Sequence, residues 1–125
     1  MPWSSVVSWN ARGQFEEAEQ YLTRALVLNE ALGRKVGVAA SLGNLGLVYR
    51  QQGALDKAAE YYHRALEVSE ALGFKVGVAA SLGNLGRVHW GRGEVLAAVT
   101  KWAHAAWIYL EVGVPFWQRW RELLH

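Results

Sequence analysis

The chain has 125 residues, with 13 lysines and arginines against 11 aspartates and glutamates, and no cysteine. The missing thiols exclude disulfides and thiolate metal sites and are compatible with the cytoplasm, where we expect the protein to reside. A net charge of +2 without a basic cluster argues against nucleic-acid binding, because several cations must converge on one face to bind phosphates. The longest uncharged stretch of the repeats, residues 36–49, is too short to span a membrane, and the first eleven residues lack the basic flank and apolar run of a secretory signal.

The most informative feature of the chain is an internal repeat. The segment KVGVAASLGNLG occupies Lys35 to Gly46 and recurs unchanged forty residues later, at Lys75 to Gly86. Self-similarity at such a period indicates a solenoid, in which each unit packs on its neighbours. We therefore expect a single domain over residues 1–125. It divides into a partial unit (1–12), three repeats (13–52, 53–92 and 93–113) and a C-terminal segment (114–125).

Each forty-residue repeat contains two predicted helices. Between Gly53 and Gly73, apolar residues recur at helical spacing, which predicts an amphipathic helix bounded by turns at these two glycines. A second helix is expected from about Lys35 to Gln51. Its packing face consists of Leu42, Leu45, Gly46 and Tyr49.

Glycines occupy positions 37, 43 and 46 of this second helix. Each glycine costs about 1 kcal/mol of helix stability relative to alanine, so a compensating role is expected. Gly46 is flanked by packing positions, and we expect it to let the two helices of a hairpin approach closely. Gly43 is expected to point elsewhere.

Tryptophans are concentrated at the two ends of the chain. Trp9 aligns with Tyr49 and Trp102 with Tyr62, so both are expected in the core. Pro115 suits the first turn of a helix, and the apolar spacing after it predicts a short amphipathic helix over residues 114–125. That helix either caps the solenoid or, like the open N-terminal end, docks on another chain. The residues of this cap or oligomer surface are Trp3, Phe116, Trp117, Trp120, Leu123 and Leu124.

The repeat also contains the pattern LxxLGxxYxxxG followed by AxxxYxxAL. Its positions are Leu42, Leu45, Gly46, Tyr49, Gly53, Ala58, Tyr62, Ala65 and Leu66. This pattern resembles the tetratricopeptide repeat. The forty-residue period and the Leu-Gly-Asn triplets at 42–44 and 82–84 are similar to the repeats of kinesin light chains and of the Leu-Gly-Asn repeat adaptors of spindle orientation. The resemblance implies an all-α solenoid of about three helical hairpins, followed by the C-terminal amphipathic capping helix.

The resemblance further implies where a partner would bind, because the first helix of each hairpin lines a concave groove in such arrays. Asn44 and Asn84 either contact bound peptide, as the matching asparagines do in these families, or bond to neighbouring helices and water. Small residues beside them leave room for another backbone. The expected groove residues are Ala40, Gly43, Asn44, Leu47, Arg50, Gln51, Ala80, Gly83, Asn84, Arg87 and Trp90.

Four of these residues could set the character of the ligand. Arg50, Gln51 and Arg87 either favour an acidic ligand, since guanidinium groups match carboxylates geometrically, or belong to a solvated helix face. Trp90 either anchors a ligand side chain or packs against the final helix.

Catalytic and metal-binding signatures are missing from the sequence. The four histidines show no HExxH spacing, and Gly91-Arg92-Gly93 lacks the rest of a phosphate-binding fingerprint. We expect no enzymatic activity, no cofactor and no metal. The expected function is a noncatalytic scaffold that binds a peptide segment of a protein partner in the groove. The alternative is a homo-oligomeric or domain-swapped module that assembles through its Trp-rich ends.

Overall fold

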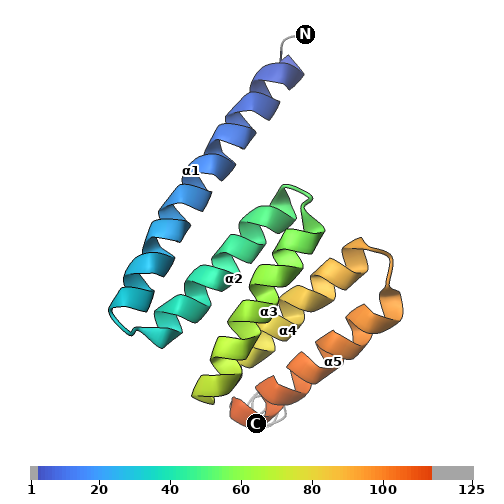
Figure 1. Ribbon diagram of the computed structural model, residues 1–125. Helices are drawn as coiled ribbons and strands as arrows, with labels where there is room; N and C mark the ends of the chain where they lie inside the picture. Colours follow the sequence, from blue (N-terminus) through green and yellow to red (C-terminus); the bar gives the residue numbers. More distant parts are fainter. Residues whose placement is uncertain (1–2, 114–125) are drawn as a thin grey trace, which may run out of the picture.

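The protein is built from antiparallel helices that pack in chain order (Figure 1). The computed structural model describes the backbone of residues 3–113 and the side chains from residue 12 onward. The helices are α1 (Trp3–Ala31), α2 (Lys35–Gln51), α3 (Leu55–Leu72), α4 (Lys75–Gly91) and α5 (Val95–Val112). The predicted all-α solenoid of helical hairpins is therefore confirmed. The capping helix expected over residues 114–125 lies outside the described residues.

Glycines end the first four helices at intervals of twenty residues. Gly33, Gly53, Gly73 and Gly93 have φ angles of 69°, 84°, 67° and 79°, in the left-handed region that glycine enters without steric cost. The residue after each glycine donates its backbone N–H to the end of the helix just completed, as Phe74 does to the carbonyl of Ser69 at 2.9 Å. The turns predicted at Gly53 and Gly73 are confirmed.

Gly13 stands in the same register as these turn glycines but does not turn the chain. Helix α1 runs through it from Trp3 to Ala31, so the structure has no break where the alignment divides the partial unit 1–12 from the first repeat. Glycine permits the left-handed conformation without requiring it. A Cβ atom added at Gly13 would meet no described residue within 4 Å, so within the described part of the chain this glycine serves neither a turn nor a close contact.

Glycines inside α2 and α4 set how closely the two helices of each hairpin pack. A Cβ atom at Gly46 would lie 2.6 Å from the ring of Tyr62 on α3, and one at Gly86 would overlap the ring of Trp102 on α5. The close approach predicted at Gly46 is confirmed. Trp102, expected in the core, contacts Gly86 but is still 36% exposed, because α5 is the last described helix and carries no further described helix on its outer side.

Three apolar clusters fill the space between consecutive helices, and each joins residues from different helices. The cluster between α2, α3 and α4 includes Tyr62, which is 0% exposed. The clusters contain Tyr49, Ala58, Tyr62, Leu85 and Val88; Leu26, Leu42, Leu45 and Ala65; and Ala79, Leu82, Ala105 and Ile108. The motif residues that define the repeat thus supply most of the core.

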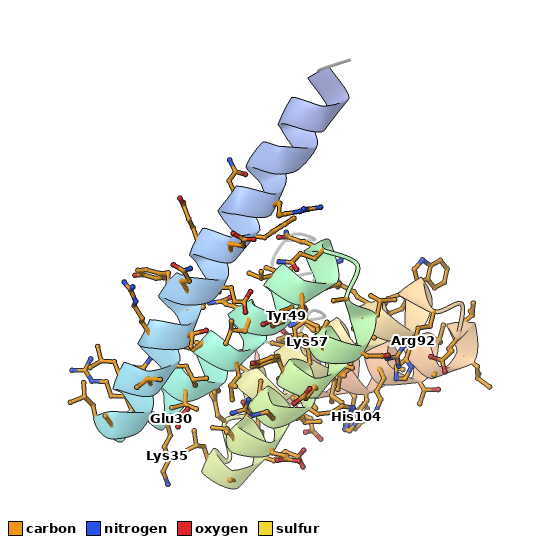
Figure 2. The ribbon with its side chains drawn as sticks, turned by 45° about the horizontal axis from the view of Figure 1, so that its top comes forward. Glu30, Lys35, Tyr49, Lys57, Arg92 and His104 are labelled. Atoms are coloured by element: carbon orange, nitrogen blue, oxygen red, sulfur yellow. The ribbon has the colours of Figure 1, made fainter. Side chains whose placement is uncertain are left out.

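A polar and aromatic cluster joins α1, α2 and α3. The Tyr49 hydroxyl donates a hydrogen bond to Oε1 of Glu19 at 2.8 Å, and its ring stacks on Tyr61 with the ring centroids 5.3 Å apart. The Lys57 ammonium lies 4.9 Å from the Tyr49 ring centroid (Figure 2). Burial, together with the Glu19 carboxylate, raises the pKa of Tyr49. The phenol therefore stays protonated at neutral pH and remains a donor that ties α2 to α1.

Candidate functional site

Three clefts follow one another along the helices. The first, about 580 Å³, lies between α1 and α2, the second, about 420 Å³, lies between α2 and α4 beside α3, and the third, about 420 Å³, lies between α4 and α5. Asn44 and Leu47 line both the first and the second cleft, while Ala80, Asn84 and Arg87 line both the second and the third. The clefts are therefore contiguous, and we call them together the groove.

The two repeated asparagines occupy the junctions between successive clefts. Asn44 separates the first cleft from the second, and Asn84 separates the second from the third. Neither side-chain amide makes a hydrogen bond to another described residue. Each amide carries both donors and an acceptor, so the groove presents the same unused polar group at two steps one repeat apart.

Small residues keep the groove open around these asparagines. A Cβ atom added at Gly43 or Gly83 would meet no atom of the described residues within 4 Å, in contrast to Gly46 and Gly86. Helical packing therefore does not require glycine at 43 or 83, although each costs about 1 kcal/mol of helix stability. Gly43 points away from its hairpin partner, as predicted, and lines the second cleft.

The second cleft also contains a buried hydroxyl without a partner. Ser69 on α3 is 1% exposed, lines this cleft, and its Oγ makes no hydrogen bond to a described residue. Apart from Asn44, Ser81, Asn84 and Arg87, the other lining residues are apolar or glycine, and they include Val36, Phe74 and Val76. The cleft thus combines an apolar lining with a few polar groups, which is typical of ligand sites.

A basic and phenolic cluster lies where α2, α3 and α4 meet. Arg87 lines the second and third clefts, and no acidic residue of the described chain lines either of them. Burial raises the pKa of the Tyr62 hydroxyl, while the adjacent Arg50 side chain, through direct contact and through its charge, and the charge of Arg87 act to lower it. The Tyr62 hydroxyl and the Nε atom of Arg50 are both buried, and neither has a partner in ideal hydrogen-bond geometry among the described residues.

Ion pairs of the described chain lie elsewhere, near the turn between α4 and α5. Arg92 pairs with Asp56 and with Glu94, and Nδ1 of His89 lies 3.3 Å from the Glu94 carboxylate. Arg50 and Arg87 take part in none of these pairs. Their charges are therefore not neutralised by contact with a described carboxylate.

Sequence reasoning placed eleven residues in the groove, and eight of them line at least one of the three clefts. Arg50, Gln51 and Trp90 do not. Trp90 is 57% exposed, and its ring centroid lies 5.8 Å from that of Trp102 on α5. The eight residues that line a cleft are Ala40, Gly43, Asn44, Leu47, Ala80, Gly83, Asn84 and Arg87.

Residues of the second helices also line the groove, and sequence reasoning missed them. Tyr21 on α1 borders the first cleft, and Trp102 and Tyr109 on α5 border the third. The missed signal on α5 was a second face at helical spacing, offset from the buried residues Ala105 and Ile108. This face was missed because the prediction considered only the first helix of each hairpin as groove-lining.

The expected cap or oligomer surface can be followed only in part. Phe116, Trp117, Trp120, Leu123 and Leu124 lie outside the described residues, and Trp3 lies on α1 where only the backbone is described. The outer face of α5 is described, and it carries large exposed apolar residues. Leu96 is 81% exposed and Trp107 is 62% exposed.

Comparison with known proteins identifies a sequence family that covers most of the helices. The sequence model of the tetratricopeptide repeat family matches residues 10–71 and 37–101. These two matches together span most of the described helices and identify the family, not the repeat type within it. A search of curated proteins finds no match. Within residues 3–113, no helix has both the length and the apolar character needed to cross a membrane.

Proposed function

Because the chain belongs to the tetratricopeptide repeat family, whose members are protein interaction modules, we propose that it is a noncatalytic cytoplasmic adaptor that binds a peptide segment of a partner in the groove. The observation that carries this proposal is the position of Asn44 and Asn84 at the junctions of contiguous clefts. An amide can donate to and accept from the main chain of an extended peptide. Two such amides, one repeat apart, would hold the peptide at two points.

Other groups in the groove fit the same ligand. The apolar lining of the second cleft can bury a peptide side chain. The open space at Gly43 and Gly83 gives a peptide backbone access close to the helix axis. These glycines are unfavourable for the helix and without a packing role, which is expected of positions that serve binding.

We expect the double substitution Asn44→Ala and Asn84→Ala to weaken peptide binding without unfolding the protein. Each lost amide contact should reduce the binding free energy by about 1 kcal/mol, because the peptide group it served returns to water. The affinity of peptides selected by the wild-type protein from a random dodecapeptide library can be measured by calorimetry. Thermal unfolding followed by circular dichroism would verify that the fold is retained.

The matched control replaces two exposed amides outside the clefts, Gln20→Ala and Gln52→Ala. This control should bind the selected peptides as the wild type does. Equal affinity of the wild type and the double asparagine variant would contradict the role of Asn44 and Asn84. Failure of the library to yield any binding peptide would count against groove binding as a whole.

The second candidate function is self-assembly, and the exposed apolar face of α5 supports it. Leu96 is 81% exposed and Trp107 is 62% exposed, and large exposed apolar side chains are found at association sites. Light scattering at increasing concentration should then detect species heavier than the 13.9 kDa chain. Leu96→Lys with Trp107→Lys should dissociate them, while Leu32→Lys, which changes an exposed leucine of the turn after α1, should not. A 13.9 kDa species at every concentration would exclude self-assembly.

A further inference from the structure

Helix α1 is longer than the other helices and projects beyond them. It has 29 residues, against 17 or 18 in each of α2 to α5, and Figure 1 and Figure 2 show its N-terminal part extending past the end of α2. Helices shorter than about 12–15 residues are marginal in water without tertiary packing. A packing partner for the projecting part would therefore stabilise it as a helix.

One side of α1 carries a stripe of residues with a period of seven. Small residues alternate along it with larger ones, in the order Ser4, Val7, Ala11, Gln14, Ala18, Tyr21, Ala25 and Leu28. This spacing keeps all eight positions on one side of a helix and is typical of helices that pair along their length. Among the described side chains of this α1 stripe, Tyr21 is 74% exposed and Leu28 is 58% exposed.

The equivalent stripe on α3 shows what covers these positions elsewhere in the array. Ala25 is only partly buried, but Ala65, forty residues later, is 2% exposed. Tyr61, the counterpart of Tyr21, stacks on Tyr49 of α2, the helix that precedes α3 and runs antiparallel to it. No helix of the described chain covers α1 in this way. The α1 stripe is therefore a face that fits an antiparallel helix.

The alternation of small and large residues selects the direction of a partner with the same stripe. In an antiparallel pair the small positions of one helix face the large positions of the other, so each alanine receives a larger side chain. In a parallel pair, alanine would face alanine and Tyr21 would face its own copy, which leaves gaps in one layer and crowding in the next. A second copy of α1 in the antiparallel direction fits the stripe better.

We propose that the protein forms a homodimer in which the α1 stripes of two copies pack antiparallel. The projecting part of each helix covers Ala18, Tyr21 and Ala25 of the other copy and takes the place that α2 takes beside α3. Helices α2 to α5 of the two copies then lie at opposite ends of the pair. The interface is symmetric, since both copies contribute the same surface, and it is separate from the exposed residues of α5.

Sedimentation velocity of the full chain tests the dimer. We expect a species with twice the 13.9 kDa mass of the chain, whose share increases with protein concentration. Tyr21→Lys with Leu28→Lys should weaken dimerisation at least about tenfold, because burying an unpaired charge in the contact is unfavourable. Both residues are exposed in the single chain, so the variant should keep its fold, which circular dichroism verifies.

The matched control is Gln20→Lys with Thr23→Lys, which adds the same two charges at exposed positions on the opposite side of α1. It should dimerise as the wild type does. A wild type of 13.9 kDa at every concentration, equal dimerisation of the wild type and the Tyr21 and Leu28 variant, or an equal loss in the control would each refute the interface.

The same measurement separates this interface from the other proposals. If Leu96→Lys with Trp107→Lys dissociates the dimer and the Tyr21 and Leu28 variant does not, the surface of α5 mediates assembly and the α1 interface is wrong. Peptide binding by the groove is measured separately. Its failure would leave the dimer prediction standing, and a monomeric protein that binds peptides would refute only the dimer.

The direction of the two helices can be measured with a single label, because the chain has no cysteine of its own. Glu30 is exposed near the end of α1 that lies away from the projecting part (Figure 2). Nitroxide labels on Glu30→Cys should lie about 40 Å apart in the antiparallel pair, roughly the length of a 29-residue helix at 1.5 Å per residue. Electron spin resonance measures this distance. A short distance, with both labels at the same end of the pair, would refute the antiparallel arrangement.

Discussion

Replacing Tyr62 with alanine should lower the free energy of unfolding by about 3–5 kcal/mol, the range found for large aromatic residues truncated in a core. Tyr62 is 0% exposed and belongs to a cluster that joins α2, α3 and α4. Its removal would empty the space against Gly46 and loosen the contact between two repeats at once. Urea unfolding followed by circular dichroism measures the loss. A decrease below about 1 kcal/mol would contradict the central position of this ring.

Tyr62→Phe is the matched control, because it keeps the ring and removes only the hydroxyl. That hydroxyl is buried without a partner in the described chain, so its removal should leave stability unchanged or raise it by about 1 kcal/mol. Comparing the unfolding free energies of the two variants separates the contribution of the ring to stability from that of the hydroxyl. A loss of more than about 2 kcal/mol in Tyr62→Phe would mean that the hydroxyl is hydrogen-bonded in the folded protein.

The fold was predictable because the same local chemistry recurs in every unit. An apolar stripe at helical spacing needs a partner, and the unchanged segments at 35–46 and 75–86 imply that the partner is a neighbouring copy. Gly53 and Gly73 could be read as turns since glycine alone enters the left-handed region without steric cost. Gly46 could be given a packing role since its neighbours Leu45 and Tyr49 share its face.

Gly13 shows that the repeat register alone does not predict a turn. It has the same sequence register as Gly53 and Gly93, yet α1 continues through it. A left-handed glycine forms a turn only when the next helix folds back and packs on the previous one, as α3 does on α2. Tertiary contacts therefore determine whether the chain turns at such a glycine, and an alignment of repeats contains no information on these contacts.

The residues that α2 and α4 contribute to the candidate site could be predicted from the sequence, but the contributions of the other helices could not. Asn44 and Asn84 could be placed by register alone, because an α-helix fixes which residues share a face. The contributions of Trp102 and Tyr109 depend on how α5 leans against α4. The unpaired state of the Tyr62 hydroxyl depends on side-chain placement across two repeats, and no local pattern encodes it.

Replacing the glycines of α2 and α4 with alanine is the second change with a large expected effect on stability. The free energy of unfolding should fall at positions 46 and 86 and rise at positions 43 and 83. Gly46→Ala and Gly86→Ala should each lower the free energy of unfolding by about 1–3 kcal/mol, because the new methyl group collides with the Tyr62 or Trp102 ring and forces the hairpin apart. The clash outweighs the better helix propensity of alanine, which is about 1 kcal/mol. Urea unfolding curves of the four single glycine variants measure both effects.

Gly43→Ala and Gly83→Ala are the matched controls, because they add the same methyl group to the same two helices where it meets no described residue within 4 Å. They should raise the free energy of unfolding by up to about 1 kcal/mol, the propensity difference alone. Stabilised variants that also bind groove peptides more weakly would show that these two glycines are kept for binding at the expense of stability. Destabilisation by Gly43→Ala, or tolerance of Gly46→Ala, would contradict the helix packing on which the groove depends.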